Sequence, residues 1–214
     1  MKKRANEIAY DYIKAKILDG TYRPAERLLE AKLSEDIGVS RNTVKKALLK
    51  LEQEQLIELT TNKGASIRSL DIDEVIQYME IREELEAKIA RRAAANISEE
   101  DTLELEKIFN TMKDLSRVHD YEEYSRNNRK FHNIIYAASG KPILTQYCMN
   151  IKTQLSRYQF KTMLVPQRSD NSLLEHNAIL QSMKEHDADA AEKAIRVHMS
   201  NLLTTIIKYK NLVF

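Results

Sequence analysis

Three of the five histidines in the chain fall on the apolar faces of predicted helices. Apolar side chains flank each of them at helical spacing, so all three are expected to point into one helical bundle. A single inward histidine is usually a core residue with a hydrogen bond. Imidazole is also the commonest transition-metal ligand, and bundle cores build metal sites from facing helices. The candidate ligands are therefore His132, His176 and His198, with Asn128 one turn before His132.

Arg82 is a further polar side chain predicted to lie inside the helical region. It falls within the apolar stripe of a helix that also carries Val75, Met79 and Ile89. A buried, unpaired guanidinium is costly, so an anionic partner is required. That partner can be Glu86, one turn along, or the carboxylate of a small effector gripped in two places. Other side chains whose positions suit either a cavity lining or simple packing are Tyr78, Tyr124, Gln154 and Tyr158.

Residues 28–59, LLEAKLSEDIGVSRNTVKKALLKLEQEQLIEL, predict a helix, a tight turn and a second helix. Gly38 stands where the chain must turn, and Ser40 stands at the N-cap of the second helix. A helix that begins with polar and basic side chains suits the DNA major groove, although an ordinary helical hairpin gives the same pattern. The residues predicted to face the groove are Ser40, Arg41, Asn42, Thr43 and Lys45, with Lys32 and Lys46 on phosphates.

The next segment, QEQLIELTTNKGASIRSL, predicts a β-hairpin. An apolar run at 56–59 and an alternating run at 65–70 flank a turn cluster at 60–64. A helix-turn-helix followed by a hairpin is a winged helix. Lys63 and Gly64 at the tip of this wing are expected to approach a phosphate or the minor groove.

The rest of the chain reads almost entirely as helix, so the fold class is mainly α. A winged helix-turn-helix domain over residues 1–70 is predicted to precede an all-helical bundle over residues 71–214. The first helix of the winged domain is expected at 5–19. Breaks and capping residues predict bundle helices at about 72–96, 99–118, 121–138, 142–164, 170–186 and 188–210.

Composition indicates a helix-rich regulator rather than a general polyanion binder. The 214 residues include only 4 Gly and 3 Pro, and the net charge is +2. Basic residues outnumber acidic ones before residue 70 and are slightly outnumbered after it, which suits DNA contact by the first domain. Cys148 is the single cysteine, and the sequence shows neither a membrane-spanning run nor a secretory signal. These features predict a cytoplasmic location.

The N-terminal region resembles the DNA-binding domain of the GntR family of bacterial transcription regulators. The matching run is IKAKILDGTYRPAERLLEAKLSEDIGVSRNTVKKALLKLEQEQLI, followed by Gly64. It is similar to the family segments Y-x-P-G-E-R-L, L-G-V-S-R and L-E-x-x-G-L. The resemblance implies a homodimer that binds a pseudo-palindromic operator, with Arg41 as the best candidate for a contact to guanine.

This region departs from the family pattern at four positions. Ala25 and Gln55 stand where glycine is usual, and Lys45 and Lys46 stand where the family has Arg and then Glu. Lysine lacks the planar fork that grips guanine in two places. The operator is therefore expected to differ from the family consensus, or to be held more weakly at that base.

The second region resembles the FCD effector domain of the FadR subfamily. The residues that carry this resemblance are Arg82-x-x-Leu85-Glu86, Asn128-x-x-Phe131-His132, Ala138-Ser139-Gly140, Glu175-His176-x-x-Ile179 and His198. Many members hold a divalent metal with an Asp and three His, and commonly use this arginine near the metal. The resemblance therefore implies a metal on Asn128, His132, His176 and His198, with Asn128 as a neutral, weaker ligand in place of Asp.

The sequence as a whole predicts a one-component transcription regulator, and a repressor in particular. A small organic acid bound in the helical domain, through Zn²⁺ or Ni²⁺, would control operator binding. One alternative is a regulator that senses the metal itself while Arg82 pairs internally. A metal-dependent enzyme is a further alternative, which is disfavoured because no inward Glu or Asp beside the histidines is evident as a general base.

Overall fold

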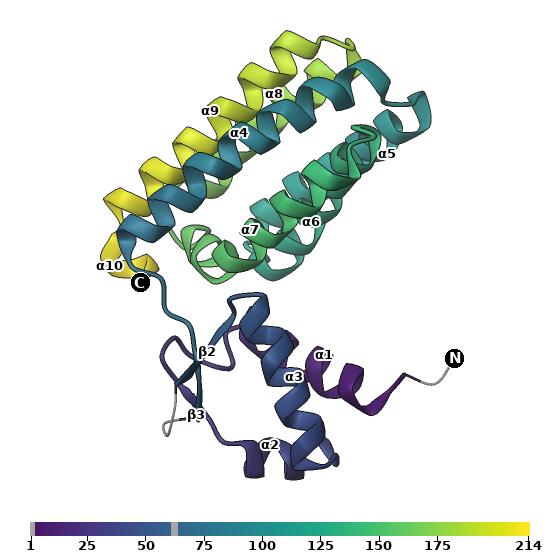
Figure 1. Ribbon diagram of the computed structural model, residues 1–214. Coiled ribbons are helices and arrows are strands. Elements are labelled where there is room, and N and C mark those ends of the chain that lie inside the picture. The colour runs from purple at the N-terminus through teal and green to yellow at the C-terminus, as the bar shows by residue number, and fades with distance from the viewer. Residues whose placement is uncertain (1–2, 61–63) are drawn as a thin grey trace. The chain divides into compact units, whose positions relative to one another are not determined.

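The computed structural model describes residues 3–60 and 64–214. The chain divides into two compact units, Met1–Asp71 and Ile72–Phe214, and each is described by itself (Figure 1). The first unit combines three helices with a small sheet, and the second is built from helices. The predicted fold class, a mainly α chain that begins with a winged helix-turn-helix, is confirmed.

The first unit begins with α1 (Ala5–Leu18) and then forms the helix-turn-helix from α2 (Glu30–Ile37) and α3 (Arg41–Gln53). Gly38 ends α2 in the left-handed conformation, with a φ of 73°. The Ser40 side chain accepts a hydrogen bond from the Thr43 backbone N–H at 3.1 Å and so caps α3. The predicted turn and N-cap therefore both form, and together they set where the exposed first turn of α3 begins.

The core of the first unit lies between these helices and the sheet. Apolar side chains at helical spacing on α1 and α3 are buried together with those of the strands, as expected for amphipathic elements. The largest of these buried side chains are Ile13, Leu48, Leu51, Ile57 and Ile67. This core orients the helix-turn-helix and leaves the polar side chains at the start of α3 outside it.

The second unit contains six long helices and one short one. They are α4 (Ile72–Asn96), α5 (Glu99–Arg117), α6 (Tyr121–Ala138), α7 (Pro142–Thr162), α8 (Arg168–Lys184), α9 (Ala188–Lys208) and α10 (Lys210–Val213). Local capping fixes several of these starts, because side chains of Ser98, Asp120 and Asp187 accept backbone N–H groups at the beginnings of α5, α6 and α9.

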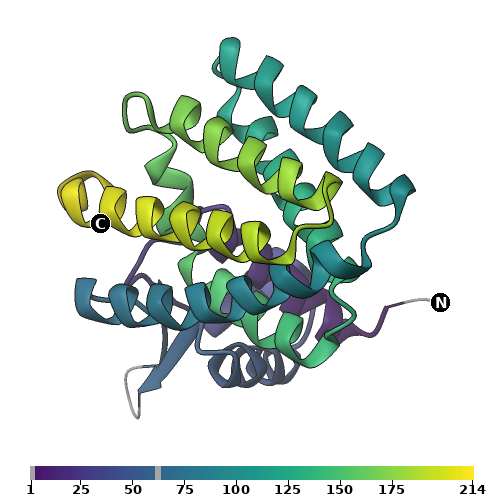
Figure 2. The same cartoon turned by 90° about the horizontal axis from the view of Figure 1, so that it is seen from above.

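The bundle is organised around α4 and α9, which run side by side (Figures 1 and 2). Helix α6 packs against both α4 and α5, and α8 packs against α5 and α9. The inward faces of α6, α8 and α9 therefore meet in the interior of the unit. No helix within residues 3–60 and 64–214 is long and apolar enough to cross a membrane.

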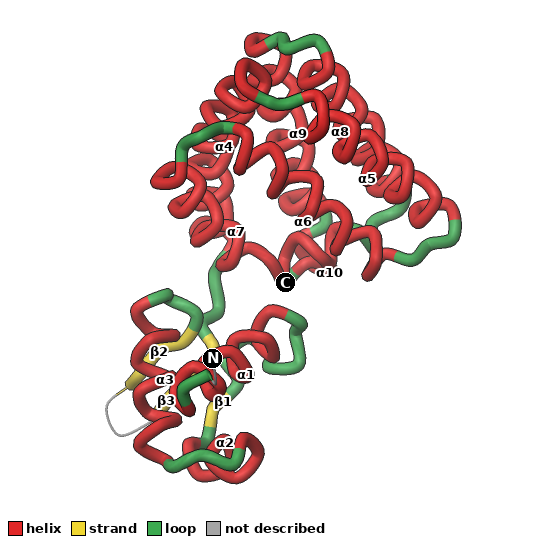
Figure 3. The backbone as a smooth tube through the Cα atoms, turned by 90° about the vertical axis from the view of Figure 1, so that its right-hand side faces the viewer, coloured by secondary structure: helices red, strands yellow, loops and turns green. Residues whose placement is uncertain are grey.

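The structure differs from the predicted elements in a few places. The wing strands β2 (Ile57–Thr60) and β3 (Gly64–Ile67) pair with each other, and β3 also pairs with a short strand β1 (Arg27–Leu28) that was not predicted (Figure 3). Two residues are too few to show alternation, so periodicity cannot reveal β1. Helix α8 begins two residues earlier than expected, and the chain end forms the separate α10.

Candidate functional site

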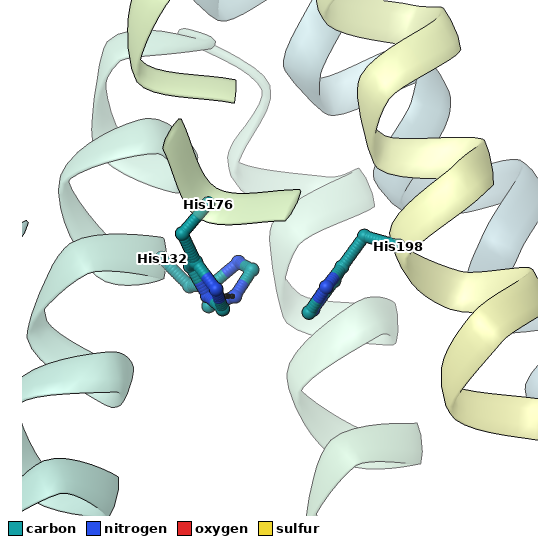
Figure 4. A group of neighbouring side chains, drawn as sticks. All are labelled: His132, His176 and His198. Carbon is teal, nitrogen blue, oxygen red and sulfur yellow. Dashed lines mark hydrogen bonds between the residues drawn. The ribbon is translucent and has the colours of Figure 1, made fainter. Parts of the chain in front are cut away.

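The three inward histidines meet in the helical unit. His132 comes from α6, His176 from α8 and His198 from α9, and their side chains point toward one another (Figure 4). All three are buried, and their candidate ligand nitrogens lie within 4.8 Å of one another. The predicted convergence of three facing helices is therefore what the structure shows.

Two of these rings have a hydrogen-bond acceptor at Nδ1, and the third faces a carboxylate at a longer distance. His198 Nδ1 lies 2.6 Å from Glu175 Oε2, and His176 Nδ1 lies 2.6 Å from the Ser172 carbonyl oxygen. The Nδ1 of His132 faces Glu86 Oε2 at 3.6 Å. A proton held on Nδ1 by such an acceptor leaves the lone pair on Nε2, as in metal-bound histidines. All three rings can therefore offer Nε2 to the same point.

The charge state of the rings also suits a metal. Burial lowers the pKa of His176 to about 3 and the pKa of His132 well below its usual value of 6.5. Burial also lowers the pKa of His198, although Glu175 acts in the opposite direction. The three imidazoles are therefore neutral at pH 7, and neutral imidazole is the form that binds a metal ion.

The separations fit a metal site with a fourth oxygen donor. His132 Nε2 and His176 Nε2 are 3.3 Å apart, and Asn128 Oδ1 lies 2.8 Å from His176 Nε2. Two nitrogens each about 2.1 Å from a tetrahedral zinc ion would be about 3.4 Å apart. Three imidazoles and one amide oxygen are thus close enough together to be candidate ligands of one metal ion, and the amide carries no charge.

Two carboxylates lie beside the histidines, although the sequence made neither of them evident there as a general base. Glu86 on α4 and Glu175 on α8 are both buried, at 1% and 8% exposure. Helical periodicity places Glu175 about 100° away from His176 on the same helix, so the two do not share a face. Glu175 instead contacts His198 on α9, and that contact depends on how the helices pack.

Glu175 is fully paired. It accepts from Asn201 Nδ2 at 2.9 Å and from Arg168 Nη2 at 3.1 Å, in addition to His198. Burial opposes ionisation of Glu175, but the hydrogen bonds from His198 and Asn201 and the charge of Arg168 together outweigh it, so the pKa is lowered. Arg168 was not expected at the site. Its Nε and Nη1 are buried without a hydrogen-bond partner among the described residues.

Glu86 is paired on one side only. Its Oε1 accepts from Arg82 Nε at 2.6 Å, so the predicted internal partner of Arg82 is present. Burial opposes ionisation of Glu86, but the charge of Arg82 lowers the pKa to about 2. Three buried atoms here have no hydrogen-bond partner within the described part of the chain, namely Arg82 Nη1, Glu86 Oε2 and His132 Nδ1. Buried polar atoms of this kind call for a further group.

A lysine adds a second cation next to Glu86. Lys152 on α7 is half-buried, and its Nζ donates to the Tyr136 hydroxyl at 2.8 Å. Burial lowers the pKa of Lys152 to about 8, so the ammonium form still predominates at pH 7. Burial raises the pKa of Cys148 to about 12 and that of Tyr136 well above its usual value, and both side chains are therefore neutral.

The other predicted lining residues lie in different surroundings. Tyr124 is fully buried, and its hydroxyl donates to Ser172 Oγ at 3.2 Å, next to His176. Tyr158 is buried with its ring 4.8 Å from that of Phe214. Tyr78 and Gln154 are half-buried on α4 and α7. The structure therefore links Tyr124 to the histidine site and shows Tyr158 in a packing role.

The predicted groove-facing residues lie on an exposed surface of the first unit. Arg41, Asn42, Lys45 and Lys46 are exposed at the start of α3, Thr43 is half-buried, and Ser40 caps the helix. Lys32 is exposed on α2. The first turn of α3 thus presents polar and basic groups without burying them.

Beside the wing lies a basic side chain, Arg27, that was not predicted to contact DNA. Gly64 is exposed with a φ of 84°, a conformation that favours glycine. A Cβ added to Gly64 would lie 3.9 Å from two nitrogens of Arg27, whose side chain extends from β1. The other predicted wing residue, Lys63, falls outside the described residues.

Known protein families match both units. The model of the bacterial regulatory proteins of the gntR family matches residues 5–67, and the model of the FCD domain matches residues 77–201. The chain belongs to the GntR family, in the branch that carries an FCD domain. It is thus a DNA-binding transcription regulator of this family with an FCD effector domain, and its relatives are regulators rather than enzymes.

Individual relatives extend along most of the chain. The HTH-type transcriptional regulator YdhC of Bacillus subtilis is 27% identical over 193 residues, which cover 90% of this chain and 86% of YdhC. The galactonate operon transcriptional repressor of Escherichia coli is 27% identical and covers 83% of this chain and 86% of its own length. The solved structure of E. coli McbR/YncC has a TM-score of 0.82 at 20% identity, and the match covers 97% of this chain and 100% of that one.

Proposed function

We propose that this GntR regulator acts in the cytoplasm as a repressor whose operator binding is controlled by a small organic acid held in the helical unit through a divalent metal. The observation that carries this proposal is the convergence of three neutral imidazoles whose Nδ1 atoms face acceptors. A cluster built only for packing has no need of three neutral imidazoles whose ligand nitrogens gather within 4.8 Å of one another.

The metal would be held by His132, His176 and His198, with the Asn128 amide oxygen as a fourth donor. Three nitrogen ligands and a neutral oxygen suit Zn²⁺ or Ni²⁺. Bound there, the metal would supply a Lewis-acidic point for the carboxylate of the effector. Arg82 would bind a carboxylate oxygen through Nη1, and Tyr124 would help to hold His176 in place through Ser172.

The operator would be bound by residues 1–70, with one winged helix on each half-site of a pseudo-palindrome and the chain acting as a homodimer. Ser40, Arg41, Asn42, Thr43 and Lys45 would face the major groove, and Arg41 would contact guanine. Lys32 and Lys46 would bind phosphates, and the wing would contribute Lys63, Gly64 and Arg27. Effector binding would change operator affinity by favouring one arrangement of the dimer over another.

The first experiment is elemental analysis of the purified protein beside the double variant His132→Ala, His176→Ala. We expect about one zinc or nickel ion per chain in the wild type and none in the variant, because two of the three imidazole ligands are removed. His119→Ala, on the exposed surface of the helical unit, is the matched control and should retain the metal. A wild-type protein without metal, even after incubation with excess zinc, would contradict the proposal.

A second candidate function is metal sensing, in which the ion itself is the signal. The pairing of Arg82 with Glu86 at 2.6 Å favours it, because the arginine then already has a partner. Operator binding followed by mobility shift, first with zinc alone and then with added carboxylic acids, separates the two functions. A response complete with zinc alone supports metal sensing, and a response that requires the acid supports the effector-controlled repressor.

A further inference from the structure

The charges around the three histidines do not balance. Arg82 and Arg168 are buried cations, and Lys152 is a half-buried third. They are matched by two carboxylates, Glu86 and Glu175, so one positive charge is left over. The neutral imidazoles and the Asn128 amide add nothing to either side. A divalent metal on the histidines would raise the surplus from one positive charge to three.

The surplus lies on the Glu86 side of the histidines. On the opposite side Glu175 faces one cation, Arg168, and its oxygens are fully occupied by donors. On the Glu86 side there are two cations, because Arg82 Nε donates to Glu86 and Lys152 Nζ donates to Tyr136, whose ring centroid lies 6.1 Å from that of His132. Both cations lower the pKa of Glu86. Lys152 also acts on His132, whose pKa its charge helps to lower.

Unpartnered buried atoms mark the same place. Arg82 Nη1, Glu86 Oε2 and His132 Nδ1 are buried with no hydrogen-bond partner among the described residues, and Lys152 Nζ donates to the neutral Tyr136 hydroxyl. A charged group in such surroundings is costly unless an anion joins it. An oxyanion placed there would accept from Arg82 and would offset the extra charge of Lys152.

We propose that the effector is a small dianion of the dicarboxylate class, with one carboxylate on the metal and the second bound by Arg82 and Lys152. This inference rests on the proposed function, because the first carboxylate needs the metal. Lys152 is then the specificity-determining residue that separates dianions from monoanions. Asn128 reinforces the preference, since an acidic side chain at that position would remove one unit of the positive surplus.

The test compares succinate with butyrate, which have the same number of carbons but two carboxylates and one. Both are titrated calorimetrically at pH 7 into the full-length, zinc-loaded protein. We expect succinate to bind at least about tenfold more tightly, because a hydrogen bond to a charged group contributes about 1.5–3 kcal/mol. Zinc content, measured on the same samples, should be one ion per chain.

Two variants assign the preference to particular residues. Lys152→Met should reduce the ratio of the two affinities about tenfold and leave zinc content unchanged, and Asn128→Asp should also reduce the ratio. Lys193→Met, at a surface position of α9, is the matched control and should keep the wild-type ratio. Lys152→Gln is the replacement if the Met variant gives an altered circular dichroism spectrum.

The outcomes separate this inference from the proposed function. Equal binding of the two acids by the zinc-loaded wild type, or an unchanged ratio in both Lys152 variants, would overturn the dianion inference and leave the metal-dependent acid site intact. Failure of both acids to bind the zinc-loaded protein at millimolar concentration would overturn the dicarboxylate class. Failure to take up zinc would overturn both proposals.

Discussion

The start of α3 and the histidine site differ in how their polar residues are held. Arg41, Asn42 and Lys45 are neighbours in the sequence, and they are exposed and lie outside the core. His132, His176 and His198 come from three helices, are buried, and depend on partners such as Glu175. One region is thus a surface displayed by a short helix, and the other is part of the interior of the bundle.

Because of this difference, a substitution can change DNA binding without changing stability, whereas a substitution in the histidine site changes both. A side chain that contacts only solvent in the free protein can be removed without loss of folding free energy. A buried polar side chain leaves its partner unsatisfied when it is removed, so a change in the site also changes stability. The effector site therefore carries a structural constraint that the DNA-contact surface lacks.

The largest loss of stability is expected for the substitution Glu175→Gln in the histidine site. The substitution leaves Arg168 buried without its anion and replaces one of the two accepting oxygens, which face Arg168, His198 and Asn201, with a donor. We expect the free energy of unfolding to fall by about 3–5 kcal/mol. Chemical denaturation of the metal-free protein, followed by circular dichroism, measures it. Glu122→Gln removes a surface ion pair with Arg126 and should have a much smaller effect, because water screens an exposed pair. Equal losses in the two variants would break the comparison.

Acid should destabilise the interior of the helical unit. The pKa of His176 is about 3 in the folded protein and about 6.5 when unfolded, so below pH 6.5 the unfolded chain binds a proton that the folded chain does not. The free energy of unfolding should therefore fall as the pH decreases, by about 2 kcal/mol at pH 5 from this group alone. Denaturation of metal-free wild type and His176→Gln at pH 7 and pH 5 should show a smaller decrease in the variant. A decrease of the same size in both would contradict the prediction.

Arg41→Ala, unlike Glu175→Gln, should weaken specific DNA binding and leave the stability of the fold unchanged. Loss of a paired contact to guanine costs about 1–3 kcal/mol, which is about 5- to 150-fold in affinity. Fluorescence anisotropy with an operator selected from a random oligonucleotide pool, and with a scrambled copy, measures the discrimination. The free energy of unfolding should change by less than about 0.5 kcal/mol. A variant that still discriminates operator from scrambled DNA would exclude Arg41 as the base contact.

The smallest expected effect concerns backbone strain in the first unit. Ala25 has a φ of 62°, in the left-handed region where a side chain is unfavourable. Ala25→Gly should raise the free energy of unfolding by about 1 kcal/mol, and Gly38→Ala, at a φ of 73°, should lower it by a similar amount. Thermal denaturation of both variants tests the pair. If Ala25→Gly fails to stabilise the protein and Gly38→Ala fails to destabilise it, φ is not the governing factor.

Much of the fold followed from local patterns. The turn at Gly38, the cap at Ser40 and the start and end of α4 each depend on a few neighbouring residues. Glycine at a positive φ, a side-chain cap and a run of helical periodicity act over one or two turns, so they can be read along the chain. The short strand β1 was missed because the strand it pairs with, β3, is distant in the sequence.

The candidate site was predictable in part for the same reason. Periodicity identified His132, His176, His198 and Arg82 as inward residues, because the face of a helix is set by its own sequence. It could not reveal that Arg168 lies at the site, nor that two cations act on Glu86. Those facts depend on which helices face each other.

The sequence by itself determined the elements, their caps and the side of each helix that turns inward, since these are short-range properties of the chain. The tertiary structure decided the partners. Asn128 contacts a histidine 48 residues away, and Glu175 contacts one 23 residues away on another helix. Such contacts arise only when whole helices pack, because the packing of many apolar side chains fixes how the helices are placed, and the polar groups meet as a consequence.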